Sequence, residues 1–157
     1  MRIALASDHA GFPLKREIAA WLESQGHTTE DFGTPDTRPA DLSDHVYPAA
    51  LAVARGQADR GVFVDGVGYG SALIANRVRG LTAVVCQDSF CARLAREHTD
   101  SNVLCLGGKI IGSAIALEIV RVWMTTGFLD QPKYRRRVDK VEQISNRHLV
   151  ALEDLDL

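Results

Sequence analysis

The sequence lacks any apolar run that approaches the roughly 20 residues a helix needs to cross a bilayer. It also lacks an excess of charge of one sign, because its formal net charge is −2 at pH 7. This balance gives no reason to expect nucleic acid or an anionic membrane as a partner. The first residues, Met1-Arg2-Ile3, lead into a strand-like segment rather than a signal peptide. We therefore expect a cytoplasmic protein.

Patterns that hold disulfides or metals are missing as well. The cysteines are three in number, contain no C-x-x-C pair and lie in apolar runs: Cys86, Cys91 and Cys105. They predict buried thiols in a reducing compartment. No metal-ligand spacing to an acid or a cysteine is found for His27, His45 and His148. We expect no metal site.

The chain has 157 residues, of which 46% are apolar and 24% charged, and this is the profile of one soluble domain, 1–157, with its own core. Apolar segments predict strands at 2–6, 61–65, 81–85 and 103–106, and a weaker pattern predicts a strand at 28–32. Helical spacing and turn residues predict helices at 13–26, 47–55, 71–78, 88–98 and from Ser113, which we expect to be the cap of its helix. Strands that alternate with helices favour an α/β fold, a five-stranded parallel sheet covered on both sides.

In such a sheet, ligands bind beyond the carboxyl ends of the strands. Asp8 and His9 follow the first strand, and Asp65 follows the third. We place the turn that begins at His98 on or near the same edge. The alternative for His98, which ends the inward-facing stripe of its helix, is a core histidine whose ring nitrogens are satisfied.

Residues 61–71 are the centre of the predicted site. An apolar strand leads through Asp65 into the alternating glycines Gly66, Gly68 and Gly70, and Ser71 can cap the helix that follows. The spacing is not G-x-G-x-x-G, and no Gly-Lys-Ser/Thr follows, which disfavours dinucleotides and nucleoside triphosphates. Free amides at this helix start can hold an anion or a developing oxyanion. The alternative is a tight turn that needs positive φ.

Asp65 is the candidate proton acceptor. The apolar strand before it predicts partial desolvation, which makes a carboxylate a better base near neutral pH. The alternative is a cap for the next helix. The same alternative holds for Asp8 near Gly11, and His9 can be a solvated loop residue.

The only dense cationic block, residues 131–140, lies in a segment with few apolar residues. We expect a helix at about 132–147 that forms a C-terminal arm and packs on another subunit. Lys133 and Arg137 are four residues apart on one helical face, where they can hold a phosphate dianion. The alternative is a solvated basic face.

Several segments, in the same order along almost the whole chain, resemble the ribose-5-phosphate isomerase B/galactose-6-phosphate isomerase family. The matching pieces are residues 3–11 (IALASDHAG), 31–34 (DFGT), 61–70, 75–80 (ANRVRG), 96–107 (REHTDSNVLCLG) and 133–140, with its Lys133-x-x-x-Arg137-Val138-Asp139-Lys140 pattern.

The resemblance implies a Rossmann-like, doubly wound fold and a homodimer or dimer of dimers with active sites built between two subunits. It implies isomerisation of an aldose and a ketose phosphate through an enediolate, without metal or organic cofactor. Asp8 and His9 are then expected to contact the open-chain sugar and its phosphate, and His98 to assist ring opening. The other expected substrate contacts are Gly66, Val67, Gly68, Gly70, Ser71, Thr99, Lys133 and Arg137.

The sequence departs from the family pattern at positions that the resemblance places in or near the active site. Asp65 stands in place of a cysteine base, Val67 in place of a threonine, and Thr99 in place of an asparagine. Lys133 replaces an arginine, and residues 41–45 (DLSDH) replace Asp-Tyr-Pro-Asp-Tyr. We hypothesise that Asp65 moves a proton between C1 and C2 while the glycine amides stabilise the oxyanion. The substrate is then ribose 5-phosphate or another tetrose, pentose or hexose phosphate.

Two other functions are open at this point. The chain can be a non-autonomous subunit of an isomerase built from unlike chains, each supplying part of a site. It can also be a phospho-acceptor receiver domain, because Asp8, Asp65 and Lys109 follow strands one, three and five. Receivers usually carry a second acid in the first turn, where this chain has His9.

Overall fold

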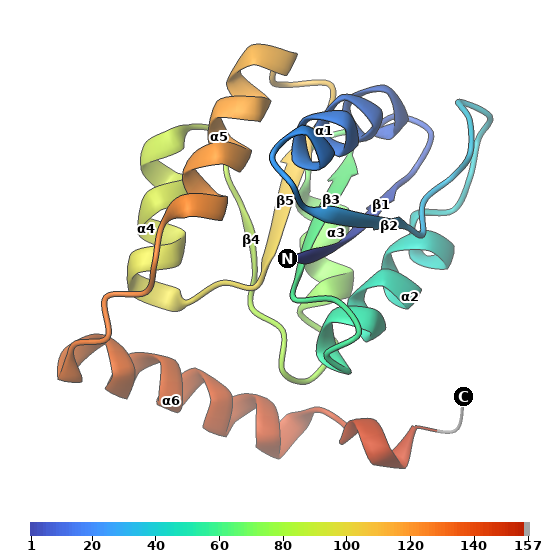
Figure 1. Ribbon diagram of the computed structural model, residues 1–157. Coiled ribbons are helices and arrows are strands. Elements are labelled where there is room, and N and C mark those ends of the chain that lie inside the picture. The colour runs from blue at the N-terminus through green and yellow to red at the C-terminus, as the bar shows by residue number, and fades with distance from the viewer. Residues whose placement is uncertain (156–157) are drawn as a thin grey trace.

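Five parallel strands form the centre of the molecule, as the computed structural model of residues 1–155 shows (Figure 1). The last two residues of the predicted domain, 156–157, lie outside the described part. The strand order is β2-β1-β3-β5-β4, and each pair of neighbours is parallel. The strands are β1 (Arg2–Ser7), β2 (Thr28–Asp31), β3 (Arg60–Asp65), β4 (Ala83–Val85) and β5 (Val103–Gly107). The predicted α/β fold with a doubly wound sheet is confirmed.

Helices cover both faces of this sheet. Helices α1 (Phe12–Ser24), α4 (Ser89–Thr99) and α5 (Ser113–Thr125) pack on one face, and α2 (Leu42–Ala54) and α3 (Tyr69–Ala75) pack on the other. A sixth helix, α6 (Pro132–His148), lies across the end where the strands begin, and a short 3₁₀ turn (Leu152–Asp154) follows it (Figure 1). No helix within residues 1–155 is both long and apolar enough to span a membrane.

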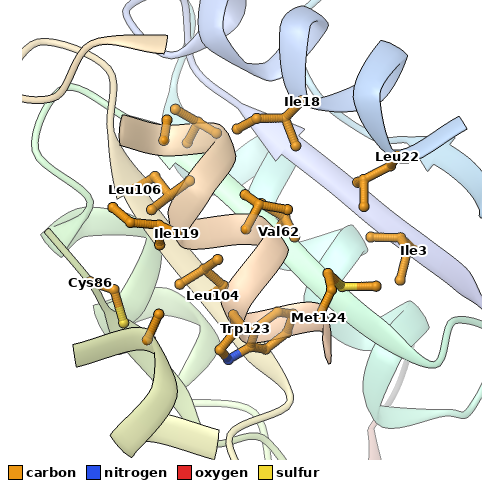
Figure 2. Close-up of a cluster of buried hydrophobic side chains, with 14 of the residues drawn as sticks. Ile3, Ile18, Leu22, Val62, Cys86, Leu104, Leu106, Ile119, Trp123 and Met124 are labelled. Atoms are coloured by element: carbon orange, nitrogen blue, oxygen red, sulfur yellow. The ribbon is translucent and has the colours of Figure 1, made fainter. Parts of the chain in front are cut away.

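The two cores arise because successive strand side chains point to opposite faces. Val62, Leu104 and Leu106 face α1, α4 and α5, where Ile119 and Trp123 of α5 complete the cluster that Figure 2 shows. The alternate strand residues face α2 and α3. Burial on both faces explains why the three central strands, β1, β3 and β5, are nearly continuous apolar runs.

Three local predictions of the fold were wrong, two of them at helix starts. Helix α2 begins at Leu42 rather than at Tyr47. Its inward face includes the buried residues Val46, Ala49 and Val53, and Pro48 is accommodated inside the helix. Ser113 is the first residue of α5 and not its cap, which is Gly112.

The third correction concerns the cysteines. Cys91 is exposed, because α4 turns Ala92 and Ala95 inward instead. The other two thiols are buried, and desolvation raises the pKa of Cys86 to about 12. Asp88 caps α4 by accepting a hydrogen bond from the Cys91 amide at 2.7 Å.

Helix α6 is held to the rest of the chain mainly at its beginning. Tyr134 is its only buried residue within the described chain, and its ring stacks on His98 of α4. Farther along, Val141 and Ile144 are 56% and 59% exposed. These exposed apolar side chains agree with an arm that packs elsewhere, and the partner subunit stays a prediction.

The fold makes a prediction at the start of α1. A Cβ on Gly11 would lie 2.0 Å from the Val64 carbonyl oxygen of β3, so Gly11→Ala must push α1 away from the sheet. We expect Gly11→Ala to lower the free energy of unfolding by about 3 kcal/mol or more in urea denaturation. The matched control is Gly127→Ala, where a Cβ meets nothing within 4 Å. Equal stability of the two variants would contradict the close approach of α1.

Candidate functional site

The turn after β3 needs glycine for two different reasons. Gly68 has a φ of +86°, so a side chain there is strained. Gly68 is the N-cap of α3, and the prediction that Ser71 caps this helix was wrong, because Ser71 is its third residue. Gly70 has no such φ, but a Cβ there would lie 2.7 Å from the Leu42 side chain of α2. Gly66 meets neither condition, because the nearest atom to its added Cβ is 3.6 Å away. The positive-φ alternative therefore applies to Gly68 alone of these three glycines.

Asp65 is buried and its carboxylate accepts four hydrogen bonds. Oδ1 accepts from the amides of Val67 at 2.9 Å and Gly68 at 2.6 Å. Oδ2 accepts from the amide of Ser71 at 2.8 Å and from its hydroxyl at 2.7 Å. The Asp65 carboxylate thus accepts hydrogen bonds from amides that we expected, from the sequence, to bind a substrate oxygen. This is the capping arrangement considered as the alternative for Asp65.

The catalytic role of Asp65 stays a prediction with a structural condition attached. A carboxylate with four donors has its lone pairs engaged, so one donor must turn away before it accepts a proton from carbon. The same burial, at 4% exposure, also removes the open acceptor side chain that a receiver domain needs. Two amides of the turn, those of Tyr69 and Gly70, have no hydrogen-bond acceptor within residues 1–155.

Asp8 and His9 lie beside this turn, at the carboxyl end of β1. Asp8 accepts from the Gly11 amide at 2.9 Å, which is the helix contact considered for it. The Nδ1 atom of His9 accepts from the Ala40 amide at 3.3 Å. Because an amide only donates, neutral His9 carries its proton on Nε2 and presents it as a donor.

Lys109 belongs to the same edge, although sequence reasoning used it only for the receiver alternative. Its amide donates to the Gly66 carbonyl at 3.0 Å, and its side chain passes 3.6 Å from the position of a Cβ on Gly66. The sequence could have indicated this position, because Lys109 follows β5 by two residues and the carboxyl ends of parallel strands meet at one edge.

A second group of predicted residues gathers around Tyr134. The His98 ring stacks on Tyr134 with centroids 4.4 Å apart. The Lys133 ammonium lies 4.6 Å and the Arg137 guanidinium 5.7 Å from the centroid of the Tyr134 ring. His98, Thr99 and Arg137 line a cavity of about 510 Å³ between α6, the end of α4 and the segment before β4. The structure therefore brings the predicted cationic residues and His98 together.

This second group lies at the opposite end of the sheet, so the place predicted for His98, on or near the carboxyl edge, was wrong (Figure 1). Helix α4 starts at the carboxyl edge after β4 and runs back to the edge where β5 begins, so His98 near its end is carried away from Asp65. Within one chain, the candidate site is thus divided into two half-sites. Among residues 1–155, no three His, Cys, Asp or Glu side chains gather as metal ligands.

The hydrogen bonds of Asp65 make a stability prediction. Asp65→Ala leaves two buried amides, a partly buried amide and a buried hydroxyl without an acceptor, and we expect a loss of about 3 kcal/mol or more in urea denaturation. The control is Ser71→Ala, which removes one donor and leaves the carboxylate with three, for an expected loss of about 1 kcal/mol. A variant Asp65→Ala as stable as Ser71→Ala would show that the carboxylate does not hold the turn.

Residues 3–141 match the protein family described as Ribose/Galactose Isomerase. The chain is 36% identical over 146 residues to ribose-5-phosphate isomerase B of Escherichia coli, covering 93% of this chain and 97% of that protein. It is 33% identical over 129 residues to D-erythrulose-4-phosphate isomerase of Pectobacterium atrosepticum, covering 82% of this chain and 85% of that protein. The solved structure of Clostridium thermocellum ribose-5-phosphate isomerase B matches with a TM-score of 0.92 at 40% identity, covering 94% of this chain and 99% of that one. The chain therefore belongs to the ribose/galactose isomerase family.

Proposed function

We propose that this protein interconverts an aldose and a ketose phosphate, with ribose 5-phosphate as the first candidate and a tetrose phosphate as the second. Relatives named for a five-carbon and for a four-carbon substrate both align with most of the chain. The observation that carries the proposal is the cationic cluster of His98, Lys133 and Arg137 around Tyr134 beside a cavity. Two cations four residues apart suit a phosphate dianion.

In this proposal, two copies of the chain build each active site. One copy supplies the glycine turn with Asp8 and His9, and a second copy supplies His98, Lys133 and Arg137. The division of these residues between opposite ends of one sheet supports this arrangement. Exposed apolar side chains on α3 and α6 supply surface for the contact, since they include Leu73 and Ile144, each 59% exposed. A homodimer or a dimer of dimers satisfies this requirement.

The proposed chemistry starts from the open-chain sugar. The Nε2–H of His9 and the free amides of the glycine turn hold the carbonyl oxygen, so that negative charge on it is stabilised as the enediolate forms. Asp65 takes the proton from C2 and returns it to C1 after the Ser71 hydroxyl turns away and frees Oδ2. Lys133 and Arg137 of the second copy bind the phosphate, and His98 assists ring opening where the sugar is cyclic.

The base assignment is tested by Asp65→Asn. An amide cannot take up the proton, so we expect kcat for the isomerised sugar to fall by about 100-fold or more, with folding checked by thermal denaturation. The substrate is first found by thermal shift with a panel of four- to six-carbon aldose and ketose phosphates. Deuterium uptake at the carbon beside the carbonyl in D₂O then reports the enediolate. A folded variant with near-normal kcat would remove Asp65 from the role.

The shared site is tested by mixing two inactive variants, His9→Asn and Arg137→Ala. After unfolding and refolding together, a mixed dimer has one site with both defects and one intact site. We expect recovery of about a quarter of the wild-type activity by random assortment of a two-fold dimer. Each variant refolded alone is the control.

Activity of the mixture that stays at the sum of the two variants would contradict a site shared between copies. Purified homo-oligomer without any turnover would instead favour the alternative that this chain needs an unlike partner subunit.

A further inference from the structure

A second histidine of the carboxyl edge, His45, is held in one defined tautomer. It lies in the first turns of α2 and is half-buried. Its Nδ1 lies 3.0 Å from the carbonyl oxygen of Phe32. A carbonyl only accepts, so Nδ1 carries the proton and Nε2 of the neutral ring keeps a free lone pair. Nε2 has no hydrogen-bond partner within residues 1–155.

The carbonyl that orients His45 belongs to a braced turn. The Gly33 amide donates to Asp31 Oδ1 at 2.8 Å, and the Lys15 ammonium, 1% exposed, donates to the same oxygen at 2.7 Å. Lys15 also donates to the Thr34 carbonyl at 3.1 Å. The Phe32 amide is bonded to β1 at 2.8 Å. A buried, bonded charge is costly to displace, so the direction of the Phe32 carbonyl is fixed.

The start of α2 is attached to both parts of the glycine-turn half-site. The Ala40 amide just before it donates to His9, and the Leu42 side chain packs against Gly70. His45 lies three residues after Leu42, on the same side of the helix. The imidazole of His45 is thus carried to the edge that holds His9 and the turn after β3.

The two histidines complement each other, because neutral His9 presents a donor and neutral His45 presents an acceptor. Among the other groups of this half-site, Asp65 is engaged by four donors and Val67 has no polar side-chain atom. Asp8 accepts from the Gly11 amide through Oδ1, and its Oδ2 has no hydrogen-bond partner within residues 1–155. We propose that His45 is a catalytic residue that carries a proton between the two oxygens of the sugar's reacting carbons. This role rests on the isomerisation proposed above.

The step balances without an added reactant. Conversion of an aldose to a ketose moves one proton from C2 to C1 and a second from the C2 hydroxyl to the former carbonyl oxygen at C1. The carbon base handles the first proton. His45 Nε2 accepts the second as the O2–H bond breaks and C2=O forms, and the imidazolium then releases it to O1. His45 is neutral again after each turnover, and His9 holds O1 throughout through its Nε2–H.

The test is His45→Asn, in which the amide nitrogen can still donate to the Phe32 carbonyl but no atom replaces Nε2. We expect kcat to fall by about 100-fold with KM changed by less than about threefold. We also expect deuterium uptake into recovered substrate to fall less than conversion does, because the carbon proton can still leave. The matched control is His27→Gln, between α1 and β2 at the opposite edge, which should keep wild-type kcat.

Two results would overturn the role: a kcat for His45→Asn within about threefold of wild type, or equal losses of exchange and conversion. If His45→Asn is unstable in urea, His45→Gln replaces it, with the same losses expected, since its amide cannot carry a proton. A wild-type protein that isomerises no sugar phosphate would defeat the proposed function itself. An active wild type with an unimpaired His45→Asn defeats only the role of His45.

Discussion

The polarity of the parallel sheet is the constraint on which the rest of this structure depends. Each chain segment that leaves a strand does so at one edge, and each segment that leaves a helix returns to the other. Asp8, His9 and the glycine turn therefore share the carboxyl edge, while His98 and the cationic helix α6 lie at the amino edge. No local adjustment of a side chain can join these groups within one copy, because the whole sheet separates them. This order of the elements is the reason for proposing a site shared between copies.

Asp65 shows how a carboxylate can fill the turn that follows it. It lies at the end of β3, and its oxygens reach three amides of that turn. Four hydrogen bonds then stabilise the carboxylate and the turn together. The proposed base, Asp65, therefore has its lone pairs engaged. Side-chain atoms at this edge without a hydrogen-bond partner within residues 1–155 include Nε2 of His9, Nε2 of His45 and Oδ2 of Asp8.

Much of the fold was predictable from the sequence, because local burial patterns encode it. The five predicted strands are all present, and the helix predicted from Ser113 is α5, whose buried face includes Ala116, Ile119, Val120 and Trp123. The start of α2 was not predictable from Tyr47 and Pro48, because residues 43–45 are polar and the inward face of the helix is defined by packing on β1, β3 and α3. The exposure of Cys91 was missed because either of two neighbouring faces of α4 could have turned inward.

The sequence by itself determined the order of strands and helices, the glycine turn and the spacing of Lys133 and Arg137, since these depend on neighbours within a few residues. Only the tertiary structure decided which edge His98 occupies, that the amides of the turn bind Asp65, and which tautomers His9 and His45 adopt. Those outcomes depend on partners distant in the chain, such as Ala40 for His9 and Phe32 for His45, 31 and 13 residues away. These partners come into contact only when the helices pack on the sheet, and the periodicity of the sequence does not predict such contacts.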